Sequence, residues 1–189
     1  MIKKMKGFTL IELLIVIAII GILAALLIPN ALEAIQKAKQ KSAMKEVMVI
    51  STAAADYMTD HGTFANLAVT GQLATALDPF PAALGAFYIK ICPWRDPWNN
   101  GYWVYTGEAN VEAVLTGADA GDIGDDDFVI SSRGRAGDDG PTYSIANWIA
   151  ATPDAMRYNV GRMADFDEDL ATWSSSWIVG PVATLVTAS

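Results

Sequence analysis

The feature that most constrains the fold of this chain is a long apolar run near its amino terminus. The run extends from Phe8 to Ile28 and holds a single charged residue, Glu12. As a helix rising about 1.5 Å per residue it would be roughly 31 Å long, enough to cross the hydrocarbon layer of a bilayer. The apolar core of a removable secretory signal is ordinarily shorter, about 7 to 15 residues. The run therefore predicts a helix that anchors the protein in a membrane.

Charges on either side of the run indicate its orientation. Lys3, Lys4 and Lys6 precede it, and Glu33 is the first charge after it. Positively charged flanks tend to stay on the cytoplasmic side of a membrane. We therefore expect a single-pass topology with a cytoplasmic amino terminus and an extracytoplasmic remainder.

Glu12 needs an explanation of its own, because an ionised carboxylate inside a bilayer costs about 2.5–3.5 kcal/mol. One interpretation is that its side chain, near the end of the helix, extends to the lipid headgroups. The other is that a cation of another molecule pairs with it at the same depth. The residues alone leave both interpretations open.

The hexapeptide Gly-Phe-Thr-Leu-Ile-Glu at residues 7–12 resembles the amino-terminal signal of type IV pilins and of the pseudopilins of type II secretion systems. The resemblance implies that a prepilin peptidase cleaves after Gly7, that Phe8 is N-methylated, and that the helix stays on the mature protein. It also implies an assembly contact between Glu12 of one subunit and the α-ammonium of Phe8 of its neighbour. Removing one member of a buried ion pair typically costs about 3–5 kcal/mol, so such a contact would favour a packed bundle.

Pro29 is a further constraint on the helix. Its ring removes an amide donor and crowds the carbonyl one turn earlier, which predicts a kink or loosening near Ala25, with Gly21 as a second weak point. The resemblance implies that such a stretch can melt during filament assembly. The alternative is that Pro29 only marks the membrane boundary.

The predicted fold class is α+β. A long helix, anchored in its first half and amphipathic in its second, packs on a small antiparallel sheet with a Gly- and Asp-rich loop. We predict a leader peptide at residues 1–7, a transmembrane and assembly helix at 8–30, a pilin-like periplasmic domain at 31–148, and a carboxy-terminal extension at 149–189. The extension lies outside the resemblance, and could be an extra strand, a contact surface or packing on the domain.

Apolar residues at helical spacing predict that the helix continues to about Asp60, with Gly62 as a left-handed cap. These residues are Leu32, Ile35, Ala38, Val47, Ile50, Ala54 and Tyr57. Four cations, Lys37, Lys39, Lys41 and Lys45, lie among them. We interpret them as a solvated face, with lipid headgroups or a neighbouring subunit's acids as alternative partners.

After the helix, residues 66–84 predict a short helix and loops that end near Pro79 and Pro81. Residues 87–91 predict an extended stretch, and 102–105 an alternating strand. Between them, Asp96-Pro97 and Asn100-Gly101 are turn signals, the second suited to residues of positive φ. This stretch resembles the turn of the major pseudopilin of type II secretion systems. The aromatic side chains of Trp98, Tyr102 and Tyr105 are expected to pack against the helix, with a ligand-binding platform as the alternative.

A second strand is predicted at residues 128–132, followed by a segment that resembles the family's calcium-binding loop. Calcium prefers six to eight oxygen ligands, and the candidates here are Ser132, Asp138 and Asp139. The match lacks the family's Gly-Gly-Glu-Gly run, and Ser144 stands where Asp is expected. Residues 165–169 imitate the start of an EF-hand, but Leu170 stands where that loop needs Gly.

Composition narrows the function classes. There are 21 acidic and 13 basic residues, a balance that argues against nucleic acid. The single histidine, His61, and the single cysteine, Cys92, give no catalytic or metal constellation, so we predict no enzyme. We expect His61 in an exposed turn and Cys92 as a small buried residue. A lone cysteine cannot close the disulfide common in major type IV pilins, which favours a pseudopilin.

The resemblance therefore implies a structural subunit of a pseudopilus that serves protein export. It implies an inner-membrane precursor with a periplasmic domain, which polymerises with itself and with minor pseudopilins. The implied partners are prepilin peptidase, an assembly ATPase and a platform protein, and the implied cofactor is Ca²⁺. Two alternatives remain: a type IV pilus subunit, and an anchored binding module that never polymerises.

Overall fold

The computed structural model describes residues 8–64, 67–85, 87–117, 122–137, 143–144, 157–160 and 162–181. The helices are α1 (Leu10–His61), α2 (Pro79–Leu84) and α3 (Glu108–Glu112), with a 3₁₀ turn η1 (Met163–Phe166). The strands are β1 (Thr70–Gln72), β2 (Trp103–Thr106), β3 (Leu115–Thr116), β4 (Phe128–Ser132), β5 (Tyr143–Ser144), β6 (Arg157–Tyr158), β7 (Leu170–Trp173) and β8 (Ser176–Pro181).

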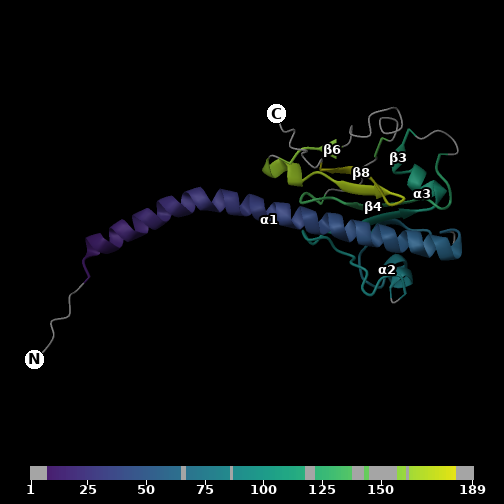
Figure 1. The fold of residues 1–189 in the computed structure, drawn as a ribbon, viewed down its shortest axis with the longest axis horizontal. Helices are drawn as coiled ribbons and strands as arrows, with labels where there is room; N and C mark the ends of the chain where they lie inside the picture. Colours follow the sequence, from purple (N-terminus) through teal and green to yellow (C-terminus); the bar gives the residue numbers. More distant parts are fainter. Residues whose placement is uncertain are drawn as a thin grey trace, which may run out of the picture.

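Helix α1 is 52 residues long and ends as the sequence predicts. Gly62 has a φ of 73°, and its N–H donates to the carbonyl of Met58 at 2.7 Å. The helix remains continuous through Ala25 and Pro29, so the predicted loosening is not seen. A proline inside a long helix costs one backbone bond and often bends the helix, and the first half of α1 is curved in Figure 1.

The two halves of α1 have different surroundings. The apolar part is a candidate membrane span by length and composition, and none of its most apolar stretch is buried inside the protein. Leu32 and Ile35 are still 49% and 51% exposed. Gln40 is the first residue of α1 that is buried, and from there on one face of the helix packs against the domain. Residues such as Val47 and Ile50 are fully buried. The first half of the helix therefore projects away from the folded domain (Figure 1).

The domain is built on a sheet with strand order β1-β2-β4-β7-β8-β6. All neighbours pair antiparallel except β6 and β8, which are parallel. Helix α1 crosses one face and contacts β4 and β7 (Figure 1). The α+β class is confirmed. The sheet is larger than expected because β6, β7 and β8 all come from the carboxy-terminal extension. Of the three alternatives for that extension, the structure shows extra strands.

Apolar side chains fill both faces of the sheet. Tyr102 and Val104 pack with the buried face of α1, as predicted for Tyr102. Tyr105 instead packs with Val111 and Val129 on the opposite face. Successive strand residues point to opposite sides, so the expectation that Tyr105 contacts the helix was wrong. The indole of Trp98 does reach α1, where its Nε1 donates to Gln36 at 2.7 Å.

Three local expectations between the helix and β2 also need correction. Pro79 and Pro81 lie inside α2, because a proline in the first turn of a helix removes a donor that has no intrahelical acceptor. Residues 87–91 form turns and one isolated bridge, Gly85 to Ile89, not an extended stretch. Strand β1 was not expected. It is a three-residue edge strand held by its pairing with β2.

Candidate functional site

The amino-terminal end of α1 carries the candidate assembly residues. Thr9 caps the helix, and its hydroxyl accepts from the N–H of Glu12 at 3.3 Å. In return, the N–H and hydroxyl of Thr9 donate to Oε2 of Glu12 at 2.9 and 2.8 Å. This reciprocal capping box satisfies donors that no helix can satisfy internally. The local sequence therefore holds the Glu12 carboxylate on Thr9, which directly follows Phe8 in the chain, and Phe8 is 80% exposed. Gly7 lies outside the described residues.

The turn before β2 is organised by the buried carboxylate of Asp96. Its Oδ1 accepts from the N–H groups of Trp98 and Asn100 at 3.0 and 2.8 Å. Its Oδ2 accepts from the hydroxyl of Ser132 at 2.8 Å. Burial raises the pKa of Asp96, although these hydrogen bonds oppose the shift and Glu46 nearby adds to it. Asp96 thus ties the turn to the end of β4.

The glycine of this turn is needed for a different reason than expected. Asn99, with a φ of 76°, is the residue of positive φ here, and Gly101 is not. A side chain on Gly101 would collide with the backbone carbonyl of Leu73, where the chain leaves β1. The Asn-Gly signal therefore marks a close approach of two backbones rather than two left-handed residues.

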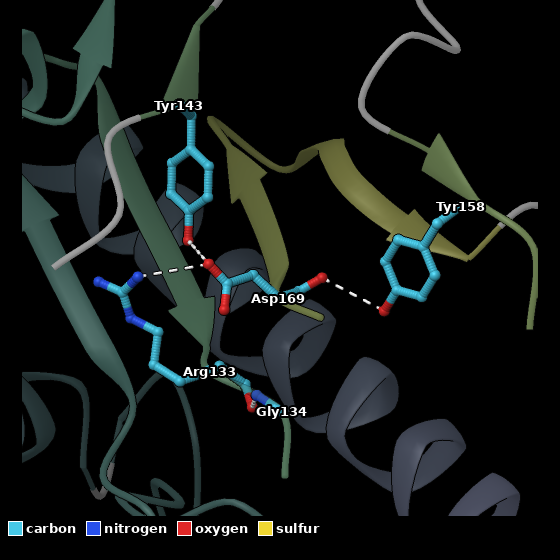
Figure 2. A network of polar contacts seen from close by, with 6 residues as sticks. Arg133, Gly134, Tyr143, Tyr158 and Asp169 are labelled. Carbon is cyan, nitrogen blue, oxygen red and sulfur yellow. Dashed lines mark hydrogen bonds and ion pairs between the residues drawn. The ribbon is translucent and has the colours of Figure 1, made fainter. Parts of the chain in front are cut away.

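A buried ion pair lies where β4, β5 and β7 meet. The side chain of Arg133 is 2% exposed, and its Nη1 lies 3.3 Å from Oδ2 of Asp169. Tyr143 donates to the same oxygen at 3.3 Å, and Tyr158 donates to the Asp169 carbonyl at 3.3 Å (Figure 2). Burial raises the pKa of both tyrosines, which therefore stay protonated donors. Gln40 of α1 donates to Tyr158 at 3.1 Å, so the network reaches the long helix.

The guanidinium of Arg133 depends on few partners. It lies 4.8 Å from the ring centroid of Trp103, a cation–π contact. Its Nε and Nη2 atoms are buried and have no hydrogen-bond acceptor in the part of the chain that the structure describes. A buried cation of this kind is stabilised mainly by its acidic partner, here Asp169.

A second arginine binds the acidic stretch that imitates an EF-hand. Arg135 forms a two-bond pair with Asp167, with distances of 2.7 and 2.8 Å, and this pair is exposed to solvent. The contact lowers the pKa of Asp167. Gly134, between the two arginines, has a φ of 57° and lies against the carbonyls of Phe166 and Glu168. Asp167 and Asp169 therefore bind arginines of the loop after β4.

The predicted calcium ligands are only partly described. The Ser132 hydroxyl donates to Asp96 and accepts from the N–H of Gly134 at 3.3 Å, so its proton and one of its two lone pairs are used within the protein. Asp138 and Asp139 lie outside the described residues. Within the described ranges, no three His, Cys, Asp or Glu side chains gather as a metal site would require. A calcium site remains a prediction that depends on Asp138 and Asp139.

Other sequence-based expectations can be compared directly. Cys92 is free and 6% exposed, as expected, and burial raises its pKa to about 11. His61 is exposed as expected, but it is the last residue of α1 and not part of a turn. Its ring stacks on that of Tyr57, with the ring centroids 4.0 Å apart. The structural roles of Asp96, Arg133 and Asp169 were missed. The signal for Asp96 was present, because an Asp followed by Pro often accepts bonds from the next backbone amides. The Arg133–Asp169 pair had no local signal.

Comparisons with known proteins agree with this architecture. Residues 2–28 match the family profile described as the prokaryotic N-terminal methylation motif. The type II secretion system core protein G of Vibrio cholerae is 30% identical over 149 residues, which cover 77% of this chain and 93% of that protein. Its namesake in Escherichia coli is 34% identical over 131 residues, covering 67% of this chain and 90% of that protein. No solved structure matches the chain significantly.

A pilus protein matches a shorter part of this chain than the core protein G relatives do. The type IV major pilin protein PilA of Myxococcus xanthus is 41% identical over 63 residues, covering 33% of this chain and 29% of that protein. A long helix that begins within a methylation motif and packs on an α+β domain defines the class of pilin-like proteins. Within that class, the chain belongs to the family of type II secretion system core protein G, the major pseudopilin.

Proposed function

We propose that this protein is a structural subunit of a pseudopilus that drives protein export by a type II secretion system. The observation that carries the proposal is the extent of the family match. The core protein G relatives align with helix and domain alike, whereas the pilin PilA matches 63 residues only. The similarity in the folded domain therefore supports a role in a pseudopilus better than a role in a type IV pilus.

Processing is the first step of the proposed role. A prepilin peptidase would cleave between Gly7 and Phe8 and methylate the new amino terminus. The match to the methylation motif supports this, and so does the exposure of Phe8 just ahead of the helix cap. Cleavage at this bond creates an α-ammonium, and methylation to a secondary amine keeps its charge.

Assembly is the second step. The Glu12 carboxylate would pair with the α-ammonium of Phe8 in an adjoining subunit. Both hydrogen bonds from Thr9 end on Oε2, and none between the described residues ends on Oε1, which would leave that oxygen for a cation from outside. In a bilayer or a helical bundle, an ammonium at that position would compensate a charge that is otherwise expensive to bury.

The proposed setting follows from the anchor. The apolar part of α1 would hold the precursor in the inner membrane, with the domain in the periplasm, and the positive amino-terminal flank supports that orientation. Self-assembly, with minor pseudopilins, would require an assembly ATPase and a platform protein. The work is mechanical, and we propose no catalytic activity. Calcium binding through Asp138 and Asp139 is part of the proposal.

A deletion strain tests the function. Loss of the gene should abolish release of type II secretion substrates into the medium while surface twitching motility continues. The wild-type chain should restore secretion. Glu12→Lys should not restore it, because two positive charges would face each other at the assembly contact. Normal secretion with lost twitching would instead identify a pilus subunit.

A non-polymerising binding module makes a different prediction for the same variant. If the protein acted as an isolated membrane receptor, Glu12→Lys would leave its activity unchanged, because the substitution lies far from the domain. Full rescue of secretion by Glu12→Lys would therefore contradict the proposed assembly.

A further inference from the structure

One side of the folded domain carries a groove between α1 and the segment that follows α2. Three adjoining depressions with volumes of about 470, 280 and 320 Å³ form it, and neighbouring depressions share lining residues. We call it the lateral groove and define it by Lys45, Val49 and Asp56 of α1 and by Phe87, Tyr88 and Ile91.

The lateral groove exposes apolar side chains that the domain leaves uncovered. Phe87 is 81% exposed, Ile91 is 77% exposed and Val49 is 49% exposed. Large apolar groups of this kind, spread along one groove and rimmed by charges, are typical of a protein contact surface. The acidic rim lies at the end farther from the membrane helix, where Asp56 and Asp60 line the groove.

A second uncovered feature lies lower on the same helix. Leu32 and Ile35 are half exposed although they lie beyond the apolar span that ends at Ile28. Lys39 follows Ile35 by one helical turn and therefore lies on the same side of α1. Along the direction of the helix, this ridge presents apolar side chains first and a cation next.

Beyond the opposite charges of Lys45 and Glu46 at its membrane end, the groove has the same order of chemistry as the ridge. Val49 lies seven residues before Asp56, so these two also share a helix face, with the apolar residue nearer the membrane. In two chains anchored in one membrane, the α1 helices run parallel. An apolar-then-basic ridge then matches an apolar-then-acidic groove without reversal of either chain.

We infer that the lateral groove receives the Leu32–Lys39 ridge of a second copy of this chain, with Ile35 against Val49 and Lys39 near Asp56. The inference rests on the proposed function, because it requires subunits that assemble side by side. Ile35 and Val49 are 14 positions apart, which sets an axial offset of roughly 21 Å between the copies. Lys39 then lies roughly 4.5 Å below the level of Asp56, within reach of a lysine side chain.

This contact joins a different pair of subunits from the proposed Phe8–Glu12 pair. Phe8 and Glu12 are four residues apart, an offset of roughly 6 Å. An offset of roughly 21 Å belongs to a more distant neighbour along a helical assembly. The groove contact would therefore tie together layers of the filament that the amino-terminal contact does not join.

Cysteine cross-linking in assembled filaments tests the contact. The full chain carrying Ile35→Cys and Val49→Cys, expressed with its assembly machinery, should give a ladder of covalent multimers with a short bis-maleimide. The matched control is Lys37→Cys with Val49→Cys, because Lys37 lies roughly 160° around the helix from Ile35. The control pair, each single variant and the wild type, whose Cys92 is buried, should stay monomeric.

Charge exchange provides an independent readout that does not depend on the cysteine pair. Lys39→Glu and Asp56→Lys should each reduce filament yield several-fold, and the double variant should restore most of it. Any of three results would overturn the inference. The Ile35→Cys/Val49→Cys chain could form filaments that give no ladder, the control pair could give an equal ladder, or the double charge variant could fail to restore the filament yield. Each of those outcomes leaves the proposed function standing. Failure of the wild type to form any filament would overturn both.

Discussion

The hydroxyl of Ser132 donates a 2.8 Å hydrogen bond to the buried carboxylate of Asp96. The bond joins the end of β4 to the turn that precedes β2, two segments that are 36 residues apart. The same carboxylate accepts from two backbone amides of its own turn. One side chain therefore sets the turn and positions the loop after β4.

Replacing Asp96 should destabilise the domain. Asp96→Ala leaves three donors without their acceptor, and each buried unsatisfied group costs about 1–3 kcal/mol. We expect a loss of roughly 3 kcal/mol or more in the free energy of unfolding, measured by urea denaturation of the detergent-solubilised chain. The control is Asp126→Ala at an exposed position, which should change stability by less than about 0.5 kcal/mol. Equal effects of the two variants would contradict the role of Asp96.

The pH dependence of stability should reveal the same carboxylate. Burial raises the pKa of Asp96, so the folded state binds this proton more tightly than the unfolded state does. Its contribution to stability therefore becomes less favourable as the pH rises from about 4, the ordinary value, through the raised pKa. Asp96→Asn keeps the shape of the side chain and removes the titration. The stability of the wild type relative to Asp96→Asn should fall over that range, and a flat or rising difference would show that the pKa is not raised.

The two arginine pairs should differ sharply in their contribution to stability. Asp169→Ala leaves the buried guanidinium of Arg133 without the acidic partner in Figure 2, which typically costs about 3–5 kcal/mol. Asp167→Ala breaks the exposed pair with Arg135, which should cost less than about 1 kcal/mol. Thermal unfolding of both variants by circular dichroism measures the difference. If Asp169→Ala melted as Asp167→Ala does, the buried pair would not be a main support of the sheet.

Calcium removal tests the predicted metal loop. If Asp138 and Asp139 bind Ca²⁺, chelation with EGTA should lower the Tm of the wild type, because a ligand that binds only the folded state stabilises it. The double variant Asp138→Ala/Asp139→Ala should show no such shift, and added Mg²⁺ should not restore the Tm of the chelated wild type. An unchanged Tm on chelation would remove calcium from the account.

Local patterns predicted the parts of this protein that local physics determines. The apolar run and its periodic continuation gave the extent of α1, and Gly62 marked its end, because helix periodicity and caps are readable over a few residues. The Gly7–Glu12 motif identified the candidate assembly residues. The alternation of residues along β2 was also evident in the sequence, but the prediction placed Tyr105 on the wrong face of the sheet.

Non-local pairings could not be predicted in the same way. Strand β7 lies between β4 and β8, although about forty residues separate β4 from β7. Nothing near Arg133 specifies that its partner is Asp169, and nothing near Thr70 specifies the edge strand β1. Such contacts depend on which segments the folded sheet brings together, a property of the whole chain.

The mature amino terminus in assembled filaments is the most direct test of the central claim. Filaments sheared or isolated from cells with an active prepilin peptidase should be analysed by intact-mass and peptide mass spectrometry. We predict subunits of this chain that begin at Phe8 and carry one N-methyl group. Filaments that lack this chain, or a chain that still begins at Met1 and sediments only as single molecules, would contradict the account.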